Sequence, residues 1–224
     1  MQITKKPSPH HDTGRAGHTP DFIVLHTTGS TTGSAVNTVT NPTSQVSYHF
    51  IVAADGTVTR HVAITDTAWA AGTTTDGGSR DPRHSPHPVI RGRRYNANLY
   101  TVNIGFGDMN LNNWTLTTAQ IDAAGRLFCH IADEVRRVYG HEIPLTREFI
   151  IGHDEIVPRH RPNCPGSRFP WDDVMQSADM PSEWARAELA QAVAAGITDG
   201  TRPQAYATRQ EVAIMVLRGK GGQP

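Results

Sequence analysis

The sequence predicts an α/β fold in which a mixed central β-sheet is flanked by helices, with a small C-terminal helical hairpin. Short apolar runs bounded by loop residues, at 22–26, 101–107 and 147–153, are typical of buried strands. Residues 47–62 alternate around Asp55-Gly56, which predicts a β-hairpin with its turn at that dipeptide. Strands that alternate with a long helical pattern favour a layered sheet covered by helices.

The long helix is expected over residues 118–139. Thr117 and Gln120 have the spacing of a capping box at its start, and Gly140 is placed to end it. One apolar stripe recurs at helical spacing, and its members are Ile121, Ala124, Phe128, Ile131, Val135 and Val138. Cys129 lies beside the stripe and is expected to be a packed thiol, whereas His130 is expected to face solvent.

Composition divides the chain into three parts. Residues 1–20 are expected to be a polar lead-in, residues 21–176 the main domain, and residues 177–224 a separate Ala-rich helical segment. In the last part, Thr208 and Glu211 have capping-box spacing ahead of a second helix.

Charge and hydropathy exclude several function classes. Lys plus Arg equals Asp plus Glu at 21 each, so no net field indicates nucleic-acid or membrane binding. No apolar run approaches the eighteen or so residues of a membrane span, and the N-terminus lacks the apolar core of a signal peptide. We therefore expect a protein made in the cytoplasm and not inserted in a membrane. A basic surface loop is expected over 72–98, with Arg80, Arg83, Arg91, Arg93 and Arg94.

Three side chains with metal-binding chemistry lie at or near predicted strand ends. His26 and His153 each end an apolar strand, and Cys164 follows on a Pro-Gly turn. Two imidazoles and a thiolate would leave one open position on a tetrahedral zinc ion. Taken singly, such residues are more often a hydrogen-bonded core histidine or an inert buried thiol, so the residues alone leave both interpretations open.

A family resemblance bears on this choice. The segments FIVLHTTGS, VSYHFIVAADGTVTRHV, TAWAAG, VNIGFG and GHDEIVPRHRPNCPG follow one another in order over residues 22–173. This series resembles the zinc-dependent N-acetylmuramoyl-L-alanine amidases, the group that includes phage T7 lysozyme and the peptidoglycan recognition proteins. The resemblance implies a Zn²⁺ cofactor, peptidoglycan as substrate, and a mixed sheet that carries the zinc in a groove.

The same resemblance implies roles for individual residues. It gives His26, His153 and Cys164 as zinc ligands and Tyr48 as the active-site tyrosine. A core aromatic is the alternative for Tyr48, since strand alternation would place it on the same face as Phe50. The other implied site residues are Arg159 and Arg161 for catalysis and Thr27, Trp69 and Asn103 for substrate binding.

The sequence departs from the family pattern at three places. Pro162 occupies the position where many relatives have Lys or Thr, which leaves Arg159, His160 or Arg161 to supply that group. Where some relatives carry a catalytic glutamate, this sequence has Gly107 at the end of Gly105-Phe106-Gly107. Ala70 replaces a histidine that is common in the family, so one substrate contact is expected to be missing.

The C-terminal segment resembles a single S-layer homology repeat, which implies binding of a secondary wall polymer; a hairpin that caps the catalytic domain is the alternative. Together these features predict a peptidoglycan hydrolase, of the phage endolysin type or a bacterial autolysin exported by another route. Three alternatives remain: a non-catalytic peptidoglycan-binding module, an amidase of muropeptide recycling, and a structural zinc protein.

Overall fold

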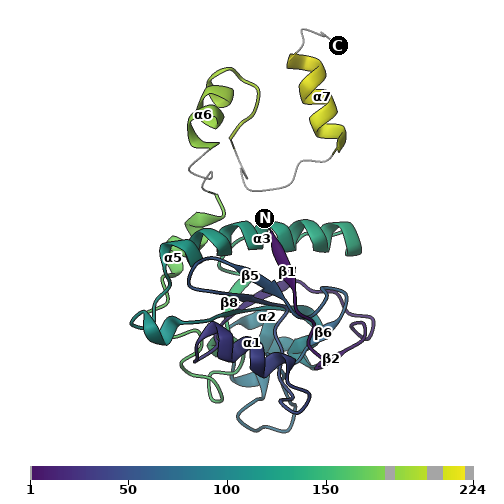
Figure 1. The fold of residues 1–224 in the computed structure, drawn as a ribbon. Helices are drawn as coiled ribbons and strands as arrows, with labels where there is room; N and C mark the ends of the chain where they lie inside the picture. Colours follow the sequence, from purple (N-terminus) through teal and green to yellow (C-terminus); the bar gives the residue numbers. More distant parts are fainter. Residues whose placement is uncertain (1, 180–184, 201–208, 220–224) are drawn as a thin grey trace.

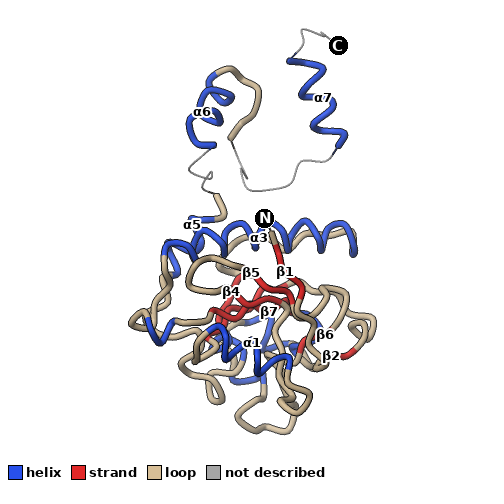
Figure 2. Tube along the Cα trace, in the orientation of Figure 1, coloured by secondary structure: helices blue, strands red, loops and turns tan. Residues whose placement is uncertain are grey.

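A mixed six-stranded sheet forms the centre of the protein (Figures 1 and 2). This computed structural model describes residues 2–179, 185–200 and 209–219. In spatial order the strands are β1 (Ile3–Lys5), β5 (Val58–Arg60), β4 (Phe50–Val52), β7 (Thr101–Phe106), β3 (Phe22–Thr27) and β8 (Ile150–Gly152). All neighbouring pairs are parallel except β4 and β5. The predicted fold class, a mixed sheet flanked by helices, is confirmed.

Helices cover both faces of the sheet (Figure 1). On one face lie α3 (Thr118–Tyr139) and α5 (Trp171–Ser177), and on the other lie α1 (Thr32–Thr40) and α2 (Pro88–Gly92). The remaining helices near the sheet are α4 (His153–Ile156) and the short 3-10 turns η1 (Pro82–His84), η2 (Ala97–Tyr100) and η3 (Met109–Leu111). Among the described residues, no helix is long and apolar enough to cross a membrane.

Alternate residues of β3 supply two separate apolar cores. Ile23 and Leu25 join the large core under α3, whereas Phe22 and Val24 join a second core beside α2 and η2. His26 follows Val24 in this alternation, so its side chain lies on the face of the sheet opposite α3. Because both faces of β3 are buried, the alternation of its side chains fixes the face of the sheet on which His26 lies.

The predicted hairpin and long helix are both present. β4 and β5 pair antiparallel, and Gly56 has the positive φ of 82° that their connecting turn requires. Thr117 and Gln120 form the reciprocal capping box of α3, and Gly140 closes the helix in the left-handed conformation. Cys129 is a packed thiol, as predicted, with 1% of its surface exposed. His130 is not simply solvated, because its Nε2 lies 3.4 Å from the Glu134 carboxylate.

The expected polar lead-in at residues 1–20 is wrong. Its start forms β1 on the edge of the main sheet, and β2 (His11–Asp12) pairs with β6 (Thr67–Ala68) in a second small sheet. Arg15 is 4% exposed and donates hydrogen bonds to backbone carbonyl oxygens of Ile64, Asn98, Leu99 and Thr101. These contacts make the segment an integral part of the domain.

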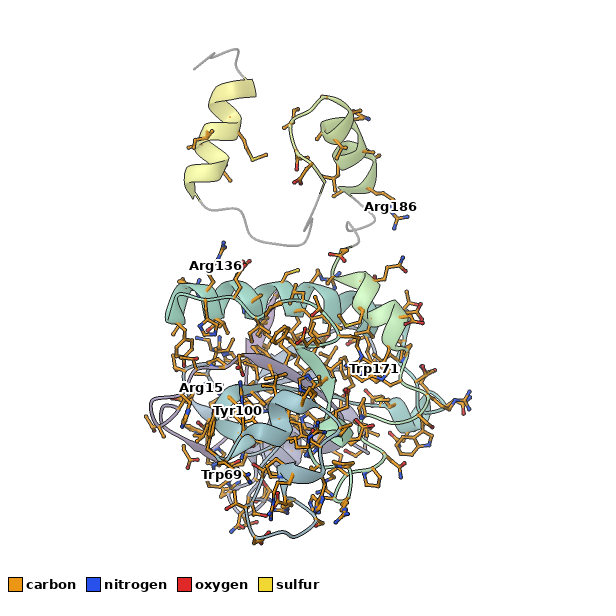
Figure 3. All side chains as sticks on the ribbon, turned by 180° about the vertical axis from the view of Figure 1, so that it is seen from behind. Arg15, Trp69, Tyr100, Arg136, Trp171 and Arg186 are labelled. Atoms are coloured by element: carbon orange, nitrogen blue, oxygen red, sulfur yellow. The ribbon has the colours of Figure 1, made fainter. Side chains whose placement is uncertain are left out.

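The expected basic loop at 72–98 is only partly a surface loop. Arg93 forms an ion pair with Asp21, and its guanidinium lies 4.1 Å from the ring centroid of Tyr100. Arg83 pairs with Asp81 in the same segment. Tyr100 is 1% exposed and lies near Arg15 beneath the sheet (Figure 3). Arg93 thus fixes part of the segment to the domain, whereas the Arg83–Asp81 pair lies within the segment.

The C-terminal segment contains α6 (Arg186–Ala194) and α7 (Arg209–Gly219). No residue of α6 is buried, and Val212, Ile214, Met215 and Val216 of α7 are all at least 40% exposed. Residues 201–208 lie outside the described residues, so the capping box expected at Thr208 and the packing of the two helices as a hairpin stay predictions. The division at residue 177 also stays a prediction.

A pair of helical glycines tests the packing of α3. A Cβ at Gly125 would lie 2.4 Å from the carbonyl oxygen of Ser177 in α5, whereas a Cβ at Gly33 in α1 would meet nothing within 4 Å. We therefore expect Gly125→Ala to lower the free energy of unfolding by about 1–3 kcal/mol through overpacking. Gly33→Ala should raise it by roughly 0.5–1 kcal/mol through helix propensity. Urea unfolding of both variants measures this difference, and shifts of the same sign would contradict the described packing.

Candidate metal centre

His26 and His153 meet because two neighbouring strands are parallel. β3 ends at Thr27, and β8 ends at Gly152, immediately before His153 begins α4. β3 and β8 pair directly, so their carboxyl ends lie at the same edge of the sheet. The two imidazole rings consequently lie 4.6 Å apart between centroids.

Cys164 reaches the same place from the loop after α4. The backbone N–H of Asp154 donates a 2.8 Å hydrogen bond to the carbonyl oxygen of Cys164, which ties the loop to the start of α4. The thiol sulfur lies 3.8 Å from His26 Nδ1. Donor atoms of His26, His153 and Cys164 all lie within 4.8 Å of one another, and all three residues are buried.

Burial sets the protonation of these groups in the metal-free protein. Burial first, with smaller effects of neighbouring charges, lowers the pKa of His26 to about 4 and the pKa of His153 to about 2. Both imidazoles are therefore neutral at pH 7 and offer lone pairs. Burial also raises the pKa of the Cys164 thiol to about 11, against the opposing effect of a hydrogen bond from the Thr27 backbone. The thiolate therefore requires a cation close by.

The donor set fits a tetrahedral soft-to-borderline metal ion. With Zn–S near 2.3 Å and Zn–N near 2.0–2.1 Å, two ligands of one zinc ion lie roughly 3.5 Å apart. The 3.8 Å between Cys164 Sγ and His26 Nδ1 is close to that spacing. His153, 5% exposed, has no hydrogen-bond partner for its ring in the described part of the chain, which leaves its lone pair available.

Tyr48 lies beside His26, with 5.1 Å between the ring centroids. Its ring packs against the small core of Ala35, Val39 and Ile51, whereas Phe50 packs in the core under α3. The expectation that Tyr48 and Phe50 share a face is therefore wrong, because β4 begins only at Phe50. Burial raises the pKa of Tyr48 above its usual value, so the phenol keeps its proton at neutral pH.

Gly105 makes room for this tyrosine. It is the register partner of His26 across β3 and β7. A Cβ at Gly105 would lie 3.1 Å from Tyr48 Cδ2 and 3.0 Å from Thr28 Cγ2. The glycine thus allows the Tyr48 ring to approach the strand at the level of the histidine.

The loop after α4 separates the three basic candidates. Arg159 donates to His84 Nε2 at 2.9 Å, and Arg80 donates to His160 Nε2 at 3.1 Å. The side chain of Arg161 is exposed and forms no hydrogen bond or ion pair within the described ranges. Its charge contributes, after burial, to the pKa values of His26, Tyr48, His153 and Cys164, and His160 contributes to that of His153. The choice among the three basic residues stays a prediction.

The residues expected to bind substrate occupy different environments. Thr27 is half-buried next to His26, and half-buried Trp69 lies on the face away from α3 with its ring 5.7 Å from that of His10. Asn103 is fully buried, and its amide contacts His26 Nε2 at 2.9 Å and Thr101 Oγ1 at 3.0 Å. Both ends of this buried amide are engaged within the protein, and substrate binding by Asn103 stays a prediction. The sequence carries no signal for these contacts, because they depend on the register that pairs Asn103 with Val24 and Gly105 with His26.

The structure also explains why position 107, directly after β7, has no carboxylate. A Cβ at Gly107 would lie 2.2 Å from Thr32 Oγ1, so no larger side chain fits there. The next residue, Asp108, has a carboxylate that accepts hydrogen bonds from the backbone and hydroxyl of Thr32 and from Ala54 N. That carboxylate fixes the start of α1 and is not free for catalysis.

Comparison with solved structures places this fold among known ones. A selenomethionine AmpD derivative is 20% identical with a TM-score of 0.51, over 78% of this chain and 93% of that one. A point mutant of PlyL is 17% identical with a TM-score of 0.51, over 80% and 98%. The N-acetylmuramoyl-L-alanine amidase LysC from Clostridium intestinale is 17% identical with a TM-score of 0.48, over 79% and 96%. The first two likenesses show a shared fold.

Comparison of the sequence with protein families identifies the family to which the chain belongs. No curated protein matches the chain significantly. The sequence pattern of the Amidase_2 family, described as N-acetylmuramoyl-L-alanine amidase, matches residues 16–167, which include β3, β7, β8 and the three candidate ligands His26, His153 and Cys164. Because this match spans well over half of the sequence, the chain belongs to the N-acetylmuramoyl-L-alanine amidase family.

Proposed function

We propose that the protein is a zinc-dependent peptidoglycan amidase that hydrolyses the amide between the lactyl group of N-acetylmuramic acid and L-alanine. The observation that carries this proposal is the convergence of His26, His153 and Cys164 at one edge of the sheet. Family membership supplies the reaction class, and the donor atoms supply the metal chemistry. A complete set of three ligands favours an enzyme over a non-catalytic wall-binding module.

The three ligands would hold Zn²⁺ with one position open to solvent or substrate. Bound zinc supplies a Lewis acid for the scissile carbonyl and lowers the pKa of a coordinated water. His26 and His153 contribute neutral donors, and Cys164 contributes the one negative charge of the set. No further His, Cys, Asp or Glu of the described chain joins this cluster, which argues against a closed structural zinc site.

Tyr48 is placed to donate a hydrogen bond at the reacting centre. Its phenol stays protonated, and its ring is held beside His26 by the space over Gly105. A fixed donor that meets developing negative charge on the carbonyl oxygen stabilises the transition state more than the ground state.

Arg161 supplies the basic group that relatives place nearer to the third ligand. Its side chain is exposed and unpaired in the described residues, so it can turn toward bound substrate. Arg159 and His160 are held by the 79–84 segment through His84 and Arg80. Their role is to fix the loop that carries Cys164.

For the biological setting we propose a lytic enzyme of the endolysin type that acts on the bacterial cell wall. Residues 177–224 would bind a secondary wall polymer and hold the enzyme at the wall. The resemblance of this segment to an S-layer homology repeat supports that role, as do the exposed apolar side chains of α7. Deleting residues 180–224, which leaves Ser177 and Ala178 packed against α3, should weaken pull-down by purified walls without lowering cleavage of soluble muropeptides.

Replacement of the thiolate tests the metal centre. We expect Cys164→Ser to bind Zn²⁺ far more weakly and to lose nearly all release of new L-alanine amino termini from purified peptidoglycan. Cys129→Ser is the matched control, because Cys129 packs under α5 away from the site. Zinc content by atomic emission and amino-terminus release are the measurements. New reducing sugar ends from the wild type would contradict the proposed scissile bond.

Removal of one hydroxyl tests Tyr48. Tyr48→Phe keeps the ring beside Gly105 and deletes only the donor, so we expect kcat to fall roughly 10²-fold with zinc content unchanged. The assay uses a synthetic muramoyl peptide at saturating concentration. A variant with wild-type kcat would assign Tyr48 to packing alone.

Two neutral substitutions separate the arginines. Arg161→Gln should lower kcat/KM by about 10-fold or more, because it removes the free cation beside the centre. Arg159→Gln removes only the contact to His84 and should change kcat/KM by less than about 3-fold, as expected for an exposed hydrogen bond. The reverse order of effects would place Arg159, not Arg161, at the reacting groups.

A further inference from the structure

A short chain of hydrogen bonds runs from the η2 turn to His26. The hydroxyl of Thr101 donates its single proton to the carbonyl oxygen of Ala97 at 2.9 Å. Toward Asn103 the same oxygen can therefore only accept, and it lies 3.0 Å from Asn103 Nδ2. The orientation of the Asn103 amide follows from this: Nδ2 faces Thr101, and Oδ1 faces His26.

The orientation of the amide decides the proton position on His26. Asn103 Oδ1 lies 2.9 Å from His26 Nε2, and a carbonyl oxygen can only accept. The proton of the neutral imidazole must therefore be on Nε2. The lone pair is then on Nδ1, the nitrogen that lies 3.8 Å from the Cys164 sulfur.

We propose that Thr101 and Asn103 are positioning residues that fix the Nε2–H tautomer and the ring orientation of His26, so that Nδ1 is presented for metal binding before the metal arrives. The metal part of this inference rests on the proposed function. Hydrogen bonds of this kind to the second nitrogen of a ligating histidine typically change metal affinity by about 10–100-fold. Here the acceptor is an amide whose own direction is set by a hydroxyl, and all three side chains are buried.

Because these side chains are buried, the loss of one hydrogen bond in the chain is expected to have a measurable effect. Thr101 and Asn103 are 0% exposed and His26 is 1% exposed, so water does not replace a lost partner without structural change. The backbone N–H of Asn103 is used separately, by His49 Nδ1 at 3.0 Å, which holds the residue in place even when its side chain is changed. His153 has no comparable orienting partner within the described residues, so the preorganisation of the centre depends on His26.

The experiment compares four variants in pairs. Asn103→Leu removes the acceptor and Asn103→Asp keeps it; Thr101→Val removes the hydroxyl and Thr101→Ser keeps it. Zinc dissociation constants are measured by competition with a chromophoric chelator, and urea unfolding of the metal-free proteins gives their stability. We expect Asn103→Leu and Thr101→Val to weaken zinc binding by about 10–100-fold, and Asn103→Asp and Thr101→Ser to weaken it by less than about 3-fold.

Two results would overturn the proposal. One is wild-type zinc affinity in both Asn103→Leu and Thr101→Val. The other is a loss of affinity in all four variants that follows their loss of metal-free stability, which is the pattern of a merely structural role.

A readout on the unmutated, metal-free protein keeps the test independent of folding and of zinc. In ¹⁵N-labelled protein, long-range ¹H–¹⁵N correlation should show His26 as the Nε2–H tautomer with a slowly exchanging proton. A protonated Nδ1 contradicts the inference directly. If the wild type shows the Nε2–H tautomer and binds no zinc, the proposed function fails while the assignment of the hydrogen-bond chain stands.

Discussion

Parallel pairing of β3 with β7 on one side and with β8 on the other brings the two histidines of the metal centre together. Because both neighbours run in the same direction, their carboxyl ends lie at one edge, where His26, His153 and Tyr48 meet. The register is fixed by two apolar cores that take alternate residues of β3. A slip by one residue would exchange the two faces and turn His26 toward α3, so core packing and site geometry depend on the same constraint.

The electrostatics of the centre follow from burial of its groups. Two carboxylates lie at the strand ends: Asp108 is occupied by the start of α1, and Asp154, directly after His153, has a pKa raised by burial to about 6 and adds to the raised pKa of the Cys164 thiol. The buried groups that remain are two neutral imidazoles and a thiol that cannot ionise alone. A divalent cation resolves this because its charge stabilises the thiolate while the imidazoles need no proton release. Arg161 adds positive charge from an exposed position, where solvent screening reduces its repulsion of the metal.

Local patterns made most of the fold predictable. The apolar strands, the Asp55-Gly56 hairpin and the capping box of α3 are each encoded within a few residues, and all three are present. β1 was missed because a three-residue strand pairs in parallel with a partner more than fifty residues away, and such a pair leaves no local period. Arg15 was missed for a related reason: its partners are backbone carbonyls, which have no sequence signature.

For the metal centre, the sequence identified the candidate residues, and the structure showed which of them lie close together. The family resemblance identified His26, His153, Cys164 and Tyr48, and the structure brings them together. It could not separate Arg159 from Arg161, because that choice depends on which side chain the 79–84 segment binds. The family resemblance assigned Asn103 to substrate binding. It could not show that this side chain is buried, because burial depends on how the strands pair.

A series of contacts connects Arg15 in the N-terminal segment to the candidate zinc ligand His26. Arg15, just before the family match at residue 16, donates to the Thr101 carbonyl oxygen, and its guanidinium lies against His49 Nε2. His49 in turn accepts from the Asn103 backbone, and Asn103 holds His26. Burial lowers the pKa of Arg15 to about 10, yet it remains charged at neutral pH, so its hydrogen bonds are charge-assisted and strong. A buried cation bonded to carbonyl oxygens cannot be withdrawn without a large desolvation cost to its partners. Residues outside the family match therefore stabilise the position of β7 on which the orientation of His26 depends.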